Sequence, residues 1–117
     1  MLKHEIIFCP KFARPVLTGE LVPALTDLLH KRASQLAVEV ETISIQPDHV
    51  RIIVIGDVPL KHLVNQLKNH SARCLRAEFP ALRSRLPCMW TRAFYARTLG
   101  ELDPIGALEF LKAQKGR

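Results

Sequence analysis

Residues 38–56, VEVETISIQPDHVRIIVIG, contain the pattern that decides the fold. The first eight residues alternate in character, which predicts a strand with residues 38, 40, 42 and 44 on one face and residues 39, 41, 43 and 45 on the other. QPDH is a turn signal, and a second apolar run, HVRIIVI, follows it directly. The stretch therefore predicts two antiparallel strands joined by a tight turn.

The second of these strands opens with a motif that the residues alone leave ambiguous. His49 and Arg51 are two positions apart, so a strand places their side chains on the same face. Two histidines at this spacing would suggest two metal ligands, but the second residue here is an arginine. A damaged metal site, a DNA-binding site and a strand with a charged edge all remain open.

Flanking segments complete the set of expected elements. HEIIFCP predicts a first strand that Pro10 ends, and regularly spaced leucines predict a helix over residues 18–36, with Pro23 in its first turn or at a kink. An apolar stripe predicts a second helix over residues 60–76. CMWTRAFYART, residues 88–98, predicts a fourth strand that Gly100 ends, and FPALRSRLP, residues 79–87, is expected to be a basic connector.

A last helix is expected at the C-terminus. Asp103 is a favourable N-cap, and Pro104 fits the first helical position, so the helix should run to about residue 115. The resulting order β-α-β-β-α-β-α predicts an α+β protein. Its fold is expected to be a ferredoxin-like split βαβ antiparallel sheet with helices on one face and an added C-terminal helix. A length of 117 residues suits one domain, residues 1–117.

Positive charge is concentrated in the second half of the chain. The net charge is +6 and the sequence pI is about 9.7. Glu78 is the single acid between Lys61 and Arg97. A charged helix face is usually only solvated, but one that is almost purely positive favours a polyanion partner. On the predicted second helix, the face opposite the apolar stripe carries Lys61, Lys68, Asn69, Arg73 and Arg76.

Cysteine usage and hydropathy suggest a cytoplasmic protein. Cys9, Cys74 and Cys88 are odd in number and lack a CxxC spacing, so a disulfide framework is not expected. His70 and Cys74 have a spacing that zinc ligands use on helices, but an apolar-facing thiol beside a surface histidine explains them better. No apolar run is long enough to cross a membrane, and the N-terminus has no signal-peptide pattern.

Four segments resemble the small single-tyrosine HUH transposases of bacterial insertion sequences (the 200/605 type). They occur in the family's order and cover nearly the whole chain: HEIIFCPKFARPVLTGE, PDHVRIIV, LKNHSARCLRAEFPALRSRL and MWTRAFYARTLGEL. The resemblance implies a dimer that recognises single-stranded DNA hairpins and cuts and rejoins one strand. It further implies a tyrosine nucleophile on the C-terminal helix and a Mg²⁺ or Mn²⁺ ion held by two motif histidines and a glutamine.

Carrying the family motif over keeps two key positions and alters two. His49 matches the first motif histidine and Gln114 the glutamine ligand, whereas Arg51 occupies the second histidine position and Phe110 the nucleophile position. Arginine is always protonated and has no lone pair to offer a metal. Phenylalanine has no hydroxyl, so it cannot attack a phosphate. We therefore expect metal binding to be weak or lost and catalysis to be impaired.

The resemblance also selects the residues expected to contact DNA phosphates. These lie after the first strand, on the second helix, in the connector and before the fourth strand: Lys11, Arg14, Lys68, Arg73, Arg76, Arg83, Arg85 and Arg92. Trp90 is expected to be structural, with stacking on a base as the alternative.

The main hypothesis is a transposase-derived protein that binds single-stranded DNA hairpins without cutting them, with Phe110 a natural change rather than an engineered one. Three alternatives stay open. The chain nicks DNA through Tyr95, its single tyrosine, or through an activated water. It is an RNA-binding ferredoxin-like module, although the paired exposed aromatics of an RNA recognition motif are not evident. Or it is a folded relic that binds nothing.

Overall fold

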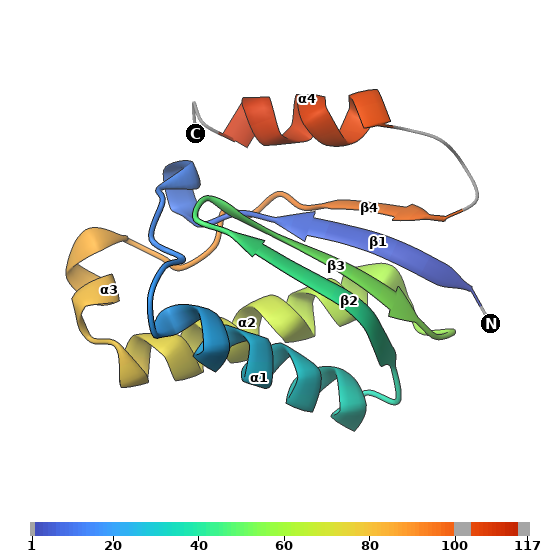
Figure 1. The fold of residues 1–117 in the computed structure, drawn as a ribbon, viewed down its shortest axis with the longest axis horizontal. Coiled ribbons are helices and arrows are strands. Elements are labelled where there is room, and N and C mark those ends of the chain that lie inside the picture. Colours follow the sequence, from blue (N-terminus) through green and yellow to red (C-terminus); the bar gives the residue numbers. More distant parts are fainter. Residues whose placement is uncertain (1, 100–103, 115–117) are drawn as a thin grey trace.

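The two strands predicted within residues 38–56 form a β-hairpin at one side of a four-stranded antiparallel sheet. In the computed structural model, which describes residues 2–99 and 104–114, β2 covers Glu39–Gln46 and β3 covers His49–Ile55. The first strand β1, Lys3–Phe8, lies between β3 and β4, Tyr95–Thr98, in the order β2-β3-β1-β4 (Figure 1). This strand order is that of the predicted split βαβ sheet.

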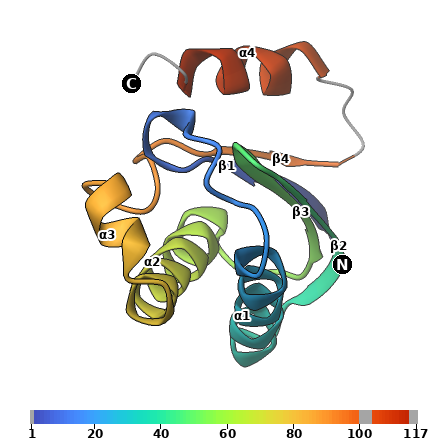
Figure 2. The ribbon, with the colours of Figure 1, turned by 60° about the vertical axis from the view of Figure 1, so that its left-hand side comes forward.

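The two faces of the sheet are covered differently. Helices α1, Leu21–Gln35, and α2, Leu60–Glu78, pack side by side on one face, while α4, Pro104–Gln114, lies over the opposite face (Figures 1 and 2). A short 3-10 turn, η1, spans Lys11–Ala13. The predicted fold class is confirmed, including the added C-terminal helix. No helix of the described residues is long and apolar enough to span a membrane.

The hydrophobic core lies between the sheet and the α1–α2 layer. In β3, burial alternates residue by residue, so Val50, Ile52 and Val54 point into the core while their neighbours point toward the α4 side. Ile6 and Phe8 of β1 join them from the adjacent strand. The facing helices contribute the apolar stripe that the sequence predicted: Leu21, Leu25, Leu29, Ala33, Leu63, Val64, Leu67 and Leu75.

The predicted alternation of β2 is wrong after its first residues. Val40 pairs with Val54 and Thr42 pairs with Ile53, so Glu41 is an extra residue and forms a β-bulge. The bulge exchanges the two faces, and Val40, Ile43 and Ile45 consequently all pack against the core. The Glu41 side chain reaches across β3 toward β1, where its carboxylate pairs with Lys3 at 3.0 Å.

The fourth strand is shorter than predicted, and the connector is partly helical. Only Tyr95–Thr98 form β4, and Trp90 makes an isolated bridge with Pro10. Residues 81–85 form the short helix α3, Ala81–Arg85. Helix α1 begins at Leu21 rather than residue 18, which places Pro23 in the first turn, where its missing N–H is not needed. Gly100, Asp103 and the predicted helix end near residue 115 lie outside the described residues.

The alternating burial of β3 predicts that truncating two neighbouring isoleucines destabilises the protein by unequal amounts. Ile52→Ala should lower the free energy of unfolding by about 2–5 kcal/mol, because Ile52 is fully buried in the core. Ile53→Ala, one residue later on the other face, should cost clearly less because Ile53 is only partly buried. Urea unfolding of both variants checks this, and equal losses would contradict the assignment of faces.

Candidate catalytic and nucleic-acid-binding site

The residues of the HUH-like motif lie on the face of the sheet that α4 covers. Arg51 and Tyr95 are both register partners of Ile7, from opposite sides, so β3 and β4 present them on the same face. Helix α4 brings Phe110 to this face, where its ring lies 6.1 Å from the Tyr95 ring, centroid to centroid. Phe110, where the resemblance leads us to expect a tyrosine nucleophile, thus faces the sheet with a hydrocarbon ring instead of a hydroxyl.

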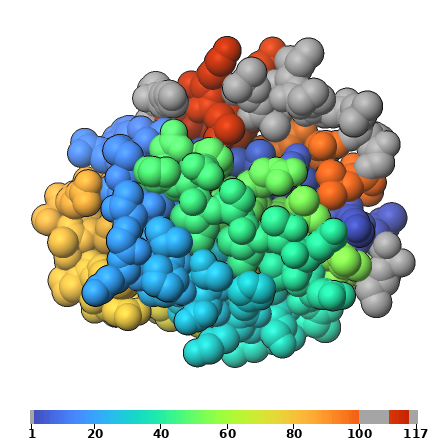
Figure 3. All heavy atoms as spheres, in the orientation of Figure 1, coloured from blue at the N-terminus to red at the C-terminus, as the bar shows by residue number. Residues whose placement is uncertain are grey.

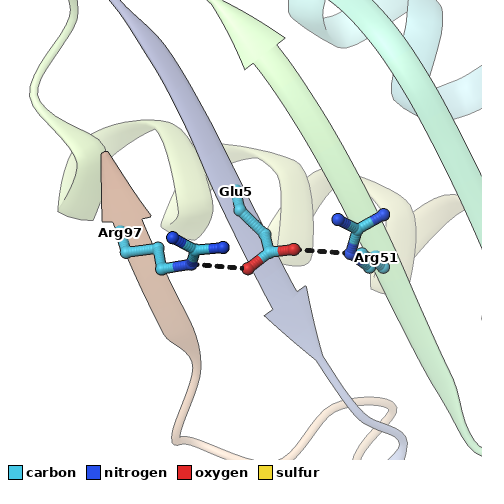
Figure 4. A network of polar contacts seen from close by, with 3 residues as sticks. All are labelled: Glu5, Arg51 and Arg97. Carbon is cyan, nitrogen blue, oxygen red and sulfur yellow. Dashed lines mark hydrogen bonds and ion pairs between the residues drawn. The ribbon is translucent and has the colours of Figure 1, made fainter. Parts of the chain in front are cut away.

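A buried carboxylate explains what Arg51 does. Glu5 of β1 has a side chain that is only 4% exposed, and it lies between two guanidinium groups. Its Oε2 accepts a hydrogen bond from Arg51 Nε at 2.5 Å and its Oε1 one from Arg97 Nε at 3.0 Å (Figure 4). Arg51 is therefore part of an ion-pair network that joins three strands, β3, β1 and β4. Sequence reasoning missed Glu5, although a single acid inside the apolar run HEIIF is a signal of such a pair.

His49 is held by the aspartate that precedes it. Its Nδ1 lies 2.8 Å from Asp48 Oδ1, so in the tautomer that donates this bond only Nε2 is left to bind a metal or a phosphate. Carboxylates orient metal-binding histidines in this way. The same bond also explains the residue as a turn histidine, so the contact alone does not define a metal site.

Gln114 is engaged inside the protein. It is 2% exposed, its Oε1 accepts a hydrogen bond from Thr91 Oγ1 at 3.3 Å, and its Nε2 donates to the Phe110 carbonyl at 3.3 Å. These bonds attach the end of α4 to the segment before β4. Among the described residues, no hydrogen bond joins Gln114 to His49.

The residues at this face do not fit a divalent metal ion. One imidazole nitrogen is available, the second ligand position is a guanidinium, and the glutamine oxygen is bonded to Thr91. Within the ranges 2–99 and 104–114, no group of three or more His, Cys, Asp or Glu side chains is arranged to hold a metal. A positive charge near the position of the ion would further weaken its binding by Coulomb repulsion.

The predicted phosphate contacts divide into exposed and buried residues. Arg14, Arg73, Arg83, Arg85 and Arg92 are exposed, whereas Lys11 and Arg76 are partly buried. Arg76 and Arg92 line a pocket of about 500 Å³ between α2 and residues 88–92. The sequence alone could not separate these two groups of residues, because both lie on the same basic segments.

Lys68 corrects the predicted charged face of α2. It is 7% exposed, and its Nζ donates to the carbonyl oxygens of Thr91, at 2.6 Å, and Arg92, at 3.1 Å. Burial lowers the pKa of its ammonium below the usual value. Lys68 therefore holds the segment before β4 in place. The expectation that it lies on the exposed face is wrong.

Trp90 and the cysteines have the structural roles expected of them. Trp90 is buried, packs edge-on against Phe8 at 4.7 Å between ring centroids, and donates from Nε1 to Ser71 Oγ at 3.1 Å. Cys9, Cys74 and Cys88 are free thiols. Burial raises the pKa of the Cys9 thiol to about 11, which keeps it protonated and unreactive near neutral pH.

The Glu5–Arg51 pair should show measurable coupling. Arg51→Met should lower the free energy of unfolding by about 2 kcal/mol, because a buried carboxylate loses one of two partners; this figure is discounted for the partial exposure of Arg51. In the double variant that also carries Glu5→Gln, the loss of unfolding free energy should be smaller than the sum of the two single-variant losses by about 1 kcal/mol. A matched double-mutant cycle on the surface pair Lys3–Glu41 should give a smaller coupling free energy. Equal coupling in the two cycles would contradict a structural role for Arg51.

Substitutions at Lys68 and Arg73 should have different effects on the free energy of unfolding. Lys68→Met should lower the free energy of unfolding by about 1–3 kcal/mol, since two carbonyls lose a charged donor. Arg73→Ala, on the exposed side of the same helix, should change it by less than about 0.5 kcal/mol. Urea unfolding followed by circular dichroism checks both, and a neutral Lys68→Met variant would contradict the role assigned to Lys68.

Comparison with known proteins places the fold in a family. The sequence profile of IS200-like transposases matches residues 1–112. The ISDra2 transposase TnpA of Deinococcus radiodurans is 28% identical over an alignment 117 residues long, which covers 97% of this chain and 84% of that protein.

Two solved structures share the fold. One, from Deinococcus radiodurans R1, is of a protein assigned as a transposase; it has a TM-score of 0.88 and 24% identity, covering 97% of this chain and 90% of that one. The other, a REP-associated tyrosine transposase bound to a REP hairpin, has a TM-score of 0.60 and 12% identity, covering 94% of this chain and 62% of that one. Because the family profile spans nearly the whole sequence, the chain belongs to the IS200-like transposase family.

Proposed function

We propose that this chain binds single-stranded DNA hairpins as a homodimer and does not cut them. Membership of a transposase family supports DNA as the partner. One protein of the same fold is described in complex with a REP hairpin, which supports a hairpin as the form of DNA. The exposed arginines of α2, α3 and residue 92 supply the phosphate contacts that such binding needs.

The observation that carries the loss of cutting is the ring of Phe110 over the sheet. It occupies the position from which a tyrosine would attack, and it packs near Tyr95 with no oxygen to offer a phosphate. The second altered position points the same way, because Arg51 is bound to Glu5 and cannot ligate a metal. What remains at the site is a cationic surface with one histidine, suited to hold a phosphodiester and not to break it.

Cutting through Tyr95 is the second candidate function. Tyr95 shares its face of the sheet with Arg51, since both are register partners of Ile7. A phenol and a guanidinium on one face of the sheet, two strands apart, have the elements of a nucleophile and a charge stabiliser. Tyr95 is partly buried on a strand beneath α4, so we rank this function below binding.

Hairpins from the ends of the genomic element that encodes the chain provide the test. Labelled single-stranded hairpins are mixed with protein in Mn²⁺ and, separately, in EDTA; a native gel scores binding and a denaturing gel scores cleavage or a covalent adduct. We expect the same shift under both conditions and no adduct. Arg73→Ala or Arg83→Ala should weaken binding to all sequences and reduce the slope of log affinity against log salt by about 0.7 for each lost phosphate contact.

Each other outcome selects an alternative. A covalent adduct that Tyr95→Phe abolishes would replace the proposal with the Tyr95 mechanism. Tighter binding to RNA of matched sequence would favour an RNA-binding module. No shift with any nucleic acid would leave a folded relic.

A further inference from the structure

We propose that Phe12 is a stacking platform for an unpaired DNA base, with phosphates on either side of that base bound by Lys11 and Arg14. The inference rests on the proposed binding of single-stranded DNA and assigns a base-binding position to it. Phe12 lies in η1, directly after β1, and is 42% exposed, whereas Phe8 and Trp90 nearby are buried. The chain thus places one large aromatic ring in solvent immediately beside its core.

The backbone holds this ring outward in an unusual conformation. Phe12 has φ 60° and ψ 17°, and Ala13 has φ 50°, so two successive residues other than glycine lie in the left-handed region. Such a conformation is rare for a bulky side chain and recurs at ligand-binding sites. Hydrogen bonds fix the turn: Ala13 N–H donates to the Pro10 carbonyl at 2.8 Å, and Lys11 N–H donates to the Met89 carbonyl at 3.1 Å.

Two cations flank the ring. Lys11 Nζ lies 5.2 Å and Arg14 Cζ 5.8 Å from the centroid of the Phe12 ring. The sequence has no acid between Glu5 and Glu20, so no carboxylate of that segment competes with a phosphate. Both cations lie over the ring, in cation–π contact with it. An aromatic ring with cations close to it is the combination that binds single-stranded nucleic acid, because every base can stack and every nucleotide brings a phosphate that can draw a cation away from the ring.

The turn is joined to the basic pocket. Pro10 forms a bridge with Trp90, and Lys11 bonds to Met89, so the turn adjoins the segment that forms one wall of the 500 Å³ pocket with Arg76 and Arg92. In the space-filling view, the blue segment after β1 reaches the surface between α3 and α4 (Figure 3). A strand stacked on Phe12 therefore has further cations next to it. Bases within a paired stem are already stacked, so the ligand is the unpaired part of a hairpin.

The test compares two labelled hairpins that differ only in their single-stranded tails. One tail has about ten thymidines and the other the same number of abasic sites, so the phosphates are equal and only the bases differ. By fluorescence anisotropy, we expect the unaltered protein to bind the thymidine tail about 5- to 100-fold more tightly. Phe12→Ala should abolish that preference without changing the salt slope. Lys11→Ala and Arg14→Ala should instead lower the slope by about 0.7 each.

The controls keep the failures distinguishable. Leu2→Ala removes another exposed apolar side chain and should leave the preference intact. Equal affinity of the unaltered protein for both tails would overturn the stacking site alone, whatever the stability of the Phe12 variants. A Phe12→Ala variant that keeps the preference but changes the oligomeric state would identify the ring as a protein contact, and would also overturn it. Failure to bind any hairpin would overturn the proposed function as well.

Discussion

The burial of Glu5 between Arg51 and Arg97 is the constraint on which the α4 side of the molecule depends. A carboxylate removed from water costs several kcal/mol unless it is paired and hydrogen-bonded, and here each oxygen has its own guanidinium. The three residues belong to β1, β3 and β4, so their bonds cross the centre of the sheet. Because the acid is on an inner strand, Arg51 has a buried partner that it neutralises. Arg51 is thus part of what holds the sheet together.

Much of the architecture could be predicted from the sequence, since it follows from periodicity. The alternation of β3, the leucine stripes of α1 and α2 and the turn between β2 and β3 are local patterns, and the helices and strands formed where these patterns placed them. The errors came from pairings that the pattern of a single segment does not contain. The bulge at Glu41 depends on the register between β2 and β3, and Lys68 bonds to the carbonyls of Thr91 and Arg92, which lie 23 and 24 residues away. For the site, the family motif located Arg51 and Phe110, but it contained no information about Glu5.

The positive charge of the chain consists of two populations. Lys68, Arg51 and Arg97 neutralise or hold groups inside the protein, whereas Arg14, Arg73, Arg83, Arg85 and Arg92 are exposed or partly so. The net charge of +6 therefore overstates, in one respect, what is available to a partner, because some cations are already committed. In another respect the net charge understates the local density of positive charge, because the exposed cations are gathered along α2, α3 and the segment before β4. Electrostatic attraction depends on this local density more than on the total.

The bulge in β2 has a consequence for how the length of this strand can vary. Removing a residue elsewhere in a strand shifts its register and exchanges its inward and outward faces. Glu41 is the residue without a ladder partner, so its deletion would leave Val40 and Ile43 on the core side and restore a regular ladder. The strand can thus lose one residue at this point while keeping its core. Deleting one residue within β3 would instead turn its core-facing valines and isoleucine to the opposite face. A change of one residue in strand length is therefore tolerated at residue 41 of β2 but not in β3.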